Sequence, residues 1–213
     1  NLIALFTPRY EADPQNLDLS KNIVKMMSLT EGCMDNDLFL NAIQTVYTLE
    51  PSASSAYYLY RLYSSRGDVD NAVKYIEEAI NSDESDALTD AGYYYELATF
   101  CIKNGKNAKA YEAAQQVVEL NPEMAGKAYM LMGTIWGSTI CGGNEIERRA
   151  PYWVAVDYMT KAKNADPSLA EDANNYIRQY ANYYPAASEA FMYDVVDGQS
   201  YTVSCGGMRA VTT

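Results

Sequence analysis

Small residues recur at a fixed phase along the middle of this chain. In the segment 67–80, GDVDNAVKYIEEAI, a glycine is followed five residues later by Ala72. The segment 104–122, NGKNAKAYEAAQQVVELNP, repeats this Gly-x4-Ala spacing and places Ala110 at the matching position. Small side chains at such positions let two helix axes approach to about 8–10 Å. The spacing therefore predicts pairs of closely packed helices that repeat along the sequence.

Further helix-period stretches accompany these segments. Three of them precede a small-residue segment: AYYLYRLYSS (56–65), YYYELATFCIKN (93–104) and AYMLMGTIWG (128–137). LFLNAIQTVYTLEP (38–51) and VAVDYMTKAKNADP (154–167) have the pattern of a second helix. Glycine ends a helix at little cost, and proline prevents a helix from continuing. We therefore expect first helices to end at Gly67 and Gly105, and second helices to be followed by Pro51, Pro122 and Pro167.

The intervals between the repeats are close to those of a known family. Ala72 and Ala110 are 38 residues apart, and Ala110 and Ala155 are 45 apart. The tetratricopeptide repeat, a helix–turn–helix unit, has a period of about 34 residues. On its small-residue positions and its helix ends, the chain resembles a tetratricopeptide repeat (TPR) protein over residues 20–184. The longer second interval implies an insertion of about 11 residues in the last repeat.

The resemblance implies an all-α fold in which antiparallel helix pairs stack into a right-handed superhelix. Ala98 and Gly133 match the small residue of a first helix, and Ala72, Ala110 and Ala155 match its partner on the second. The units are expected at 20–52, 53–88, 89–123 and 124–167, followed by a capping helix at 168–184. The first unit is the most degenerate, with Phe39 where alanine is expected. We predict that Ser168 is the N-cap of the capping helix, with Glu171 completing a capping box.

The two ends of the chain do not follow the repeat pattern. Residues 1–19 have the pattern of the end of an upstream structural element, followed by a link that contains prolines. Residues 185–213 change period, because Asp197-Gly198 is a turn signal and the segments SYTVSC and MRAVTT alternate as strands do. We predict a short β-hairpin or an extended tail in this C-terminal extension.

Charge and composition argue against several classes of function. The formal net charge of −12 repels phosphate backbones, so we expect no nucleic-acid partner. Histidine is absent from the sequence, which removes the commonest general base and the commonest metal ligand. We therefore expect no catalytic residues, no cofactor and no metal site. No stretch approaches the ~18–20 apolar residues of a membrane span.

The first helices of a TPR array line its concave face, where members of the family hold a peptide. By the phase of the family, the exposed positions on this face are Tyr57, Arg61, Ser65, Tyr95, Thr99, Lys103, Met130 and Thr134. Aromatic rings mixed with isolated cations suit the backbone and apolar side chains of a protein partner. The alternative is that the tyrosines only fill contacts between helices. Lysine and asparagine do not recur at these positions, so the carboxylate clamp of some TPR domains is not expected.

The segment 141–153, CGGNEIERRAPYW, interrupts the fourth unit. It is either a recognition loop or an extension that lengthens the two helices of that unit and packs on the tail. Cys141 and Cys205 each precede Gly-Gly, whereas Cys33 and Cys101 fall in segments expected to be helical and buried. A disulfide between Cys141 and Cys205 would limit fraying of the tail, and the alternative is two free thiols. The insertion and tail resemble those of TPR proteins of Gram-negative cell envelopes, which implies an extracytoplasmic, periplasmic setting; the cytoplasm is the alternative.

Three functions are compatible with the sequence. The resemblance implies a non-catalytic scaffold or adaptor that binds another polypeptide on its concave face. The chain is alternatively the structural, C-terminal part of a larger cell-envelope protein whose groove is filled by its own segments. A third interpretation is a helical small-ligand binder or enzyme that uses the tyrosine-lined concavity. The sequence identifies neither the partner nor the oligomeric state.

Overall fold

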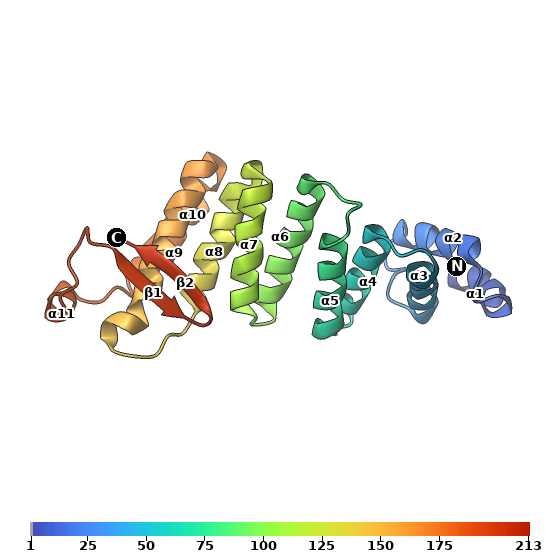
Figure 1. Cartoon of the computed structure of the whole chain (residues 1–213), viewed down its shortest axis with the longest axis horizontal. Helices are drawn as coiled ribbons and strands as arrows, with labels where there is room; N and C mark the ends of the chain where they lie inside the picture. The colour runs from blue at the N-terminus through green and yellow to red at the C-terminus, as the bar shows by residue number, and fades with distance from the viewer. Residues whose placement is uncertain (1) are drawn as a thin grey trace. The chain divides into compact units, whose positions relative to one another are not determined.

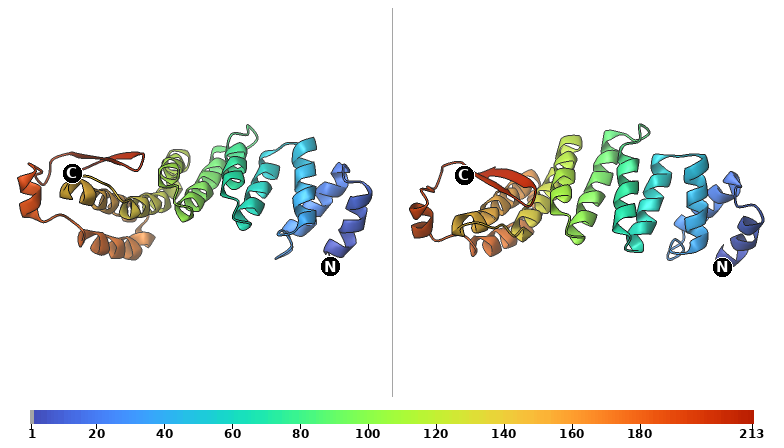
Figure 2. Two further views of the ribbon diagram at one scale, coloured as in Figure 1. Left: turned by 90° about the horizontal axis from the view of Figure 1, so that it is seen from below. Right: turned by 60° about the horizontal axis from the view of Figure 1, so that its bottom comes forward.

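The chain consists of helix pairs followed by a β-hairpin (Figures 1 and 2). A computed structural model describes residues 2–213. This part of the chain contains eleven α-helices, two short 3₁₀ helices and two strands. It divides into two compact units, one that ends at Asp86 and one that covers Ala87–Thr213. The predicted all-α fold with a short C-terminal β-hairpin is confirmed.

The first unit contains five helices. They are α1 (Leu2–Ala12), α2 (Leu17–Ser28), α3 (Asp37–Leu49), α4 (Ala53–Ser65) and α5 (Val69–Ile80). Helix α2 packs on α3, α4 packs on α5, and α3 joins the two pairs by contacting α4. Phe39 of α3 is fully buried in the core, where its ring meets Tyr58 of α4 edge-on at a centroid distance of 6.3 Å. The first pair therefore has a large buried ring at the position where the other pairs have a small residue.

The N-terminal segment consists of a helix followed by a short link. Residues 2–12 form helix α1, with Pro8 inside it, and only the short stretch before Leu17 is a link. Phe6 of α1 is 4% exposed and belongs to the core of the first unit. Tyr10 anchors the end of α1, because its hydroxyl donates to the carbonyl of Asn41 at 3.0 Å. The apolar face of this segment, rather than its prolines, determines its structure.

Glycine and capping residues end the helices as the sequence predicts. Gly67 follows α4 with a φ of +73°, a left-handed conformation that residues with a β-carbon rarely adopt. Gly105 has the same role after α6 (Ala87–Lys103), with a φ of +70°. Asp68 then caps α5 by accepting a hydrogen bond from the Asn71 amide at 3.2 Å. The loop between the helices of a pair is consequently short.

The second unit contains two helix pairs, a capping helix and the hairpin. Its helices after α6 are α7 (Asn107–Leu120), η1 (Pro122–Met124), α8 (Ala125–Ser138), α9 (Glu145–Ala165), η2 (Pro167–Leu169), α10 (Ala170–Ala181) and α11 (Ala187–Met192). Helix α6 packs on α7, α8 on α9, and α10 on α9. The small residues Ala98, Ala110 and Ala155 are all fully buried. They allow the close approach of paired helices on which the fold depends.

The insertion in the fourth unit becomes part of a long helix. Helix α9 has 21 residues and begins at Glu145, inside the segment 141–153. Asn144 and Glu147 form a capping box, with the Glu147 amide donating to Asn144 Oδ1 at 2.9 Å. Helix α9 also contacts both strands of the C-terminal hairpin. Much of the insertion therefore lengthens a helix that supports the tail.

Two local predictions are wrong. Ser168 does not cap α10; its amide and hydroxyl instead donate to Asp166 Oδ1, at 3.0 and 2.6 Å. The reason is Pro167, which begins the 3₁₀ helix η2, so that the capping side chain is Asp166, two residues earlier than predicted. Cys33 is not helical but lies half-buried in the loop between α2 and α3. Cys101 is buried in α6 as predicted.

The tail folds into a hairpin that lies along α9 (Figures 1 and 2). Strands β1 (Tyr201–Cys205) and β2 (Met208–Thr212) pair antiparallel, with Cys205 opposite Met208. The two-residue turn is Gly206-Gly207, and both residues have positive φ, at 61° and 77°. Such a turn matches the right-handed twist of paired strands. The hairpin turn thus lies at the second Gly-Gly and not at Asp197-Gly198.

Candidate binding surfaces

The predicted partner-binding residues lie on three first helices, α4, α6 and α8. Arg61, Ser65 and Lys103 are exposed, and the other members of the set are half-buried. The serine and threonine hydroxyls of this set bond within their own helices: Ser65 donates to the Leu62 carbonyl at 2.8 Å. Thr99 and Thr134 donate in the same way to the carbonyls four residues earlier, both at 2.9 Å. The cations are consequently the polar groups of this set with the most freedom to meet a partner.

A groove of about 320 Å³ lies in the first unit, between the first helices α2 and α4. Its floor is apolar, because Val24 of α2 and Ile43 and Val46 of α3 line it. The remaining lining residues are Lys21, Lys25, Ser28, Leu29, Ser52, Ser54, Ser55 and Tyr58. We call this feature the α2–α4 groove. All of its lining belongs to α2, α3, α4 and two cap residues, Leu29 after α2 and Ser52 before α4.

Two lysines give the α2–α4 groove a positive wall. Lys21 Nζ pairs with Glu50 Oε2 at 2.5 Å, and both side chains are about half exposed. Lys25 lies one helical turn further along α2 and is exposed. Within residues 2–213, no carboxylate lies within ion-pair distance of the Lys25 ammonium. The groove therefore offers a free cation beside an apolar floor in a chain of net charge −12.

Sequence reasoning missed this groove. We predicted no face residue in the first unit, because its small-residue pattern is too degenerate to set the phase of α2. In α4 the groove is lined by Tyr58, the neighbour of the predicted Tyr57. A signal was nevertheless present: Lys21 and Lys25 recur at i and i+4 in a chain with only 16 basic residues. Lysines at this spacing share one face of a helix.

A larger pocket, of about 570 Å³, lies in the second unit. Its walls come from α9, the link after α10, α11, the segment before β1, and both strands. Its lining residues are Trp153, Asp157, Tyr184, Pro185, Ala187, Ala190, Phe191, Val195, Val196, Asp197, Gln199, Tyr201, Thr212 and Thr213. We call it the C-terminal pocket. Its volume is in the usual range of small-ligand sites, about 300–1,000 Å³.

Aromatic rings and one carboxylate dominate the inner part of this pocket. The rings of Tyr184 and Tyr201 both meet Trp153 nearly perpendicularly, with centroid distances of 6.3 and 5.7 Å. Asp157 lies one turn after Trp153 on α9 and accepts a hydrogen bond from the Thr212 side chain of β2. Burial raises the pKa of Asp157, although the Thr212 hydrogen bond and the charge of Lys161 act in the opposite direction. Burial and the nearby Asp157 charge raise the pKa of Tyr184 to about 12.

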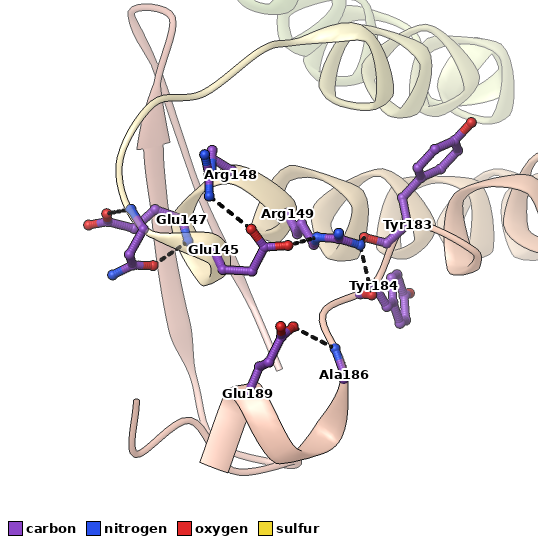
Figure 3. Close-up of polar contacts among 9 residues, drawn as sticks. Glu145, Glu147, Arg148, Arg149, Tyr183, Tyr184, Ala186 and Glu189 are labelled. Carbon is purple, nitrogen blue, oxygen red and sulfur yellow. Dashed lines mark hydrogen bonds and ion pairs between the residues drawn. The ribbon is translucent and has the colours of Figure 1, made fainter. Parts of the chain in front are cut away.

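Hydrogen bonds and ion pairs hold in place the link after α10, which forms one wall of the C-terminal pocket (Figure 3). Arg149 of α9 donates to the backbone carbonyls of Tyr183 and Tyr184, at 3.3 and 3.4 Å. Glu145 binds the guanidinium groups of Arg149 and Arg148. The Arg149 hydrogen bond is the main reason that the pKa of Glu145 is lowered. These charges of the insertion thus position the backbone beside the pocket.

A disulfide ties the hairpin to the loop before α9. Cys141 and Cys205 are bonded, with their Cα atoms 5.7 Å apart and a sequence separation of 64. In the described part of the chain, Cys33 and Cys101 form no disulfide. Cys205 ends β1, the strand whose first residue, Tyr201, lines the C-terminal pocket. The bond therefore holds one wall of the pocket to the helical part of the unit.

Two other kinds of feature are not found in the described residues. Over residues 2–213, no three acidic or cysteine side chains come together in a way that could hold a metal ion. In the same part of the chain, none of the helices has the length and apolar character required to cross a bilayer.

Comparison with known proteins identifies the repeat. A family profile described as "Tetratricopeptide repeat" matches residues 61–86 and 91–124. No curated protein matches the chain at a significant level. Among solved structures, "Crystal structure of MamA protein" has 22% identity and a TM-score of 0.59, covering 79% of this chain and 83% of that one. A second MamA structure has 20% identity and the same TM-score over 79% and 89%.

A third solved structure is a more distant match. "Crystal structure of YrrB: a TPR protein with an unusual peptide-binding site" has 16% identity and a TM-score of 0.48, over 90% of this chain and 98% of that one. At these levels of identity the MamA likeness establishes the fold alone. The repeat profile and the helix pairing together establish the repeat type.

Proposed function

Because the chain is a tetratricopeptide-repeat protein, we propose that it is a scaffold that binds a segment of another polypeptide on its first helices. The observation that carries this proposal is the α2–α4 groove, in which an apolar floor lies beside the free ammonium of Lys25. Apolar side chains of a bound segment would pack on Val24, Ile43 and Val46. An acidic residue of that segment would meet Lys25.

The polar residues of the groove wall favour a bound polypeptide segment over a small compact ligand. Serine residues of α4 and its N-cap contribute hydroxyls along the groove, at Ser52, Ser54 and Ser55. Ser52 and Ser55 are already bonded to each other in a capping box, so Ser54 is the exposed hydroxyl of the three. A mixture of apolar floor and polar rim is typical of protein interfaces. We infer binding without catalysis, since the sequence has no histidine to act as a general base.

A selection from a displayed peptide library tests this proposal. We expect the intact chain to enrich segments in which an acidic residue lies near two or more apolar residues. Lys25→Glu should lower the affinity for the enriched peptides by at least about tenfold, since reversing a charge opposite a carboxylate replaces attraction by repulsion. Lys74→Glu, the same reversal on the second helix α5, is the matched control and should leave binding unchanged. Equal binding to the wild type and Lys25→Glu would contradict the assignment of the groove.

The predicted ring residues of α4 and α6 are tested by a separate variant. The double substitution Tyr57→Ala and Tyr95→Ala removes one ring from each unit while leaving Lys21 and Lys25 in place. If the enriched peptides also contact either ring, the double variant should bind them more weakly. If only the α2–α4 groove binds, the double variant should retain wild-type affinity and Lys25→Glu should not.

We also propose an extracytoplasmic location. The Cys141–Cys205 bond supports it, because disulfides persist in oxidising compartments and are rare in the cytosol. Trapping of thiols with a maleimide in intact cells, before lysis, tests the proposal. Two reactive cysteines after unfolding are expected from an oxidising compartment, and four would place the chain in a reducing one.

A further inference from the structure

The C-terminal pocket has an acidic and aromatic lining that the peptide-binding role of the first helices does not explain. Two carboxylates, Asp157 and Asp197, line it. Its aromatic residues are Trp153, Tyr184, Phe191 and Tyr201. None of the residues that line the pocket is lysine or arginine. A molecule that enters this pocket therefore meets negative charge and ring surfaces without a competing cation.

Among the residues that the structure describes, the carboxylate of Asp157 makes no ion pair, although the charge of Lys161 acts on it from further away. Its one hydrogen bond comes from the neutral hydroxyl of Thr212, a residue that is 3% exposed. Lys161 lies one turn further along α9, but its ammonium is over the ring of Tyr158, 5.0 Å from the centroid. Within residues 2–213, no cation lies within ion-pair distance of Asp157. A half-buried carboxylate without a cation in contact is costly to the fold, since it loses hydration without gaining an ion pair.

The rings around Asp157 are arranged to receive a cation. Trp153 lies one turn from Asp157 on the same helix, and Tyr184 and Tyr201 flank it at nearly perpendicular angles of 76° and 84°. The negative face of an aromatic ring attracts an ammonium or guanidinium group, most strongly when water is excluded. Ala187, Ala190, Val195 and Val196 add apolar surface for the body of such a ligand. The ligand would thus be positive at one end and apolar along its length.

We propose that the C-terminal pocket binds an organic cation, an ammonium or guanidinium group on an apolar body, with Asp157 as its counter-ion and Trp153, Tyr184 and Tyr201 around it. The cation is either a free amine or the side chain of lysine or arginine in a polypeptide. This site lies in the second unit and does not depend on the α2–α4 groove. The two proposals can therefore fail separately.

The two tryptophans of the chain make the test specific. Trp153 lines the pocket, whereas Trp136 is fully buried in α8, so their indole N–H signals in an NMR spectrum serve as probe and internal control. Titration of the full chain with n-butylammonium or n-butylguanidinium should shift the Trp153 signal saturably and leave that of Trp136 in place. The neutral isostere n-butanol should bind at least about tenfold more weakly. Capped tripeptides with a central lysine, arginine or norleucine form the second arm.

Variants then assign the counter-ion. Asp157→Asn keeps the shape of the side chain and the hydrogen bond to Thr212. It should lower the affinity for the cations by at least about tenfold. Glu112→Gln removes the same charge from the exposed surface of α7 and should leave the affinity unchanged. Tighter binding of the lysine or arginine tripeptide than of the free cation identifies a polypeptide source, and the reverse order identifies a free amine. The proposal is overturned if no cation shifts Trp153 up to about 10 mM, a very weak affinity, if n-butanol binds as well, or if Asp157→Asn binds like the wild type.

Discussion

Gly133 of α8 lies so close to Ala155 of α9 that a β-carbon on the glycine would be 3.1 Å from the Ala155 carbonyl oxygen. The same β-carbon would be 2.7 Å from the Met159 side chain. These separations are shorter than ordinary van der Waals contacts. The pairing of α8 with α9 therefore requires that position 133 has no side chain.

Gly133→Ala should consequently destabilise the second unit. Alanine is the better helix former, but here its methyl group forces α8 away from α9, and overpacking of this kind costs about 1–3 kcal/mol. Urea unfolding followed by tryptophan fluorescence measures the effect, because both tryptophans lie in the second unit. The matched control is Gly92→Ala in α6, where the added β-carbon meets nothing within 4 Å.

The control should change stability in the opposite direction. Replacing a helical glycine by alanine without a clash stabilises a protein by about 0.5–1 kcal/mol, since the unfolded chain loses conformational freedom. If Gly133→Ala were as stable as Gly92→Ala, close packing at position 133 would not be a requirement of the fold.

This contact also explains how much of the fold could be predicted from sequence. Small residues where helices cross and glycines at helix ends can be recognised locally, because the first permit close packing and the second adopt a left-handed conformation. These residues identify the pairs α4–α5, α6–α7 and α8–α9. The first pair has Phe39 at the crossing, so its pattern is weaker and the phase of α2 could not be assigned. Two features could not be predicted from the repeat pattern: helix α1, and the cap at Asp166. Both depend on the residues around a proline, and the repeat pattern gives no information about those residues.

Alkaline pH should unfold the protein through its buried tyrosines. The hydrogen bond to Glu78 is the main cause that raises the pKa of Tyr47 to about 12, and burial raises that of Tyr180 to about 12. Burial, with the hydrogen bond to Tyr111, also raises the pKa of Tyr158. An unfolded tyrosine ionises near about pH 10. The stability that these groups provide is therefore complete below about pH 10 and is lost as the pH rises through their folded pKa values.

Tyrosinate absorbance during a pH titration measures this behaviour. We expect a first group of exposed tyrosines to ionise near their ordinary pKa, and a second group to ionise together with loss of helical circular dichroism. Tyr180→Phe should lessen the dependence of stability on pH above about 10, because phenylalanine cannot ionise. Ionisation of all 20 tyrosines in one step, with the helices intact, is the result that would contradict the prediction.

Asp157→Asn should stabilise the second unit at neutral pH. Because burial raises the folded pKa of Asp157, the unfolded chain releases this proton more readily than the folded one. The stability associated with Asp157 is therefore fully present below its unfolded pKa, about 3.9, and is lost as the pH rises through the folded value. Asparagine has no charge to bury, so the variant should be the more stable one at pH 7, and the difference should vanish in acid.

Urea unfolding at several pH values tests this prediction independently of any ligand. Glu112→Gln provides the comparison, since it removes the same single negative charge at an exposed position. A wild type that is more stable than Asp157→Asn at pH 7 would mean that Asp157 already has a stabilising partner. A saturating organic cation should remove the advantage of the variant, because a ligand that binds only the folded wild type stabilises it.

The C-terminal pocket shows why the site was harder to predict than the fold. Trp153 was recognised as an aromatic at the end of the insertion, and the hairpin was predicted from its alternation. Their meeting was not, because Tyr201 and Thr212 reach α9 only when the tail folds back along it. Contacts between segments far apart in sequence leave no periodic signal. Lys21 and Lys25 could be recognised in the sequence as two lysines on one face of a helix. The first repeat is too degenerate to show that this face of α2 lines a groove.

Removal of the Cys141–Cys205 bond should loosen the hairpin while leaving the helices paired. The bond closes a loop of 64 residues, for which the chain-entropy estimate is about 4 kcal/mol and typical measured values are about 2–4 kcal/mol. Isolated two-stranded hairpins are marginal in water, so this one depends on the bond and on its contacts with α9. In the double variant Cys141→Ser and Cys205→Ser, we expect the amides of β1 and β2 to exchange hydrogen much faster, and those of α6 and α7 to be unchanged.

Hydrogen exchange with and without a reductant separates the bond from the substitution. In the wild type, reduction should reproduce the effect of the double variant, because Cys33 and Cys101 form no disulfide that could be reduced. In the variant, the reductant should have no effect. Val203, Met208 and Thr212 are each at most 5% exposed against the rest of the unit, so their burial is the competing source of stability for the hairpin. Hairpin amides that keep full protection in the variant would show that this burial alone holds the tail, and that the disulfide is not needed to form the wall of the pocket.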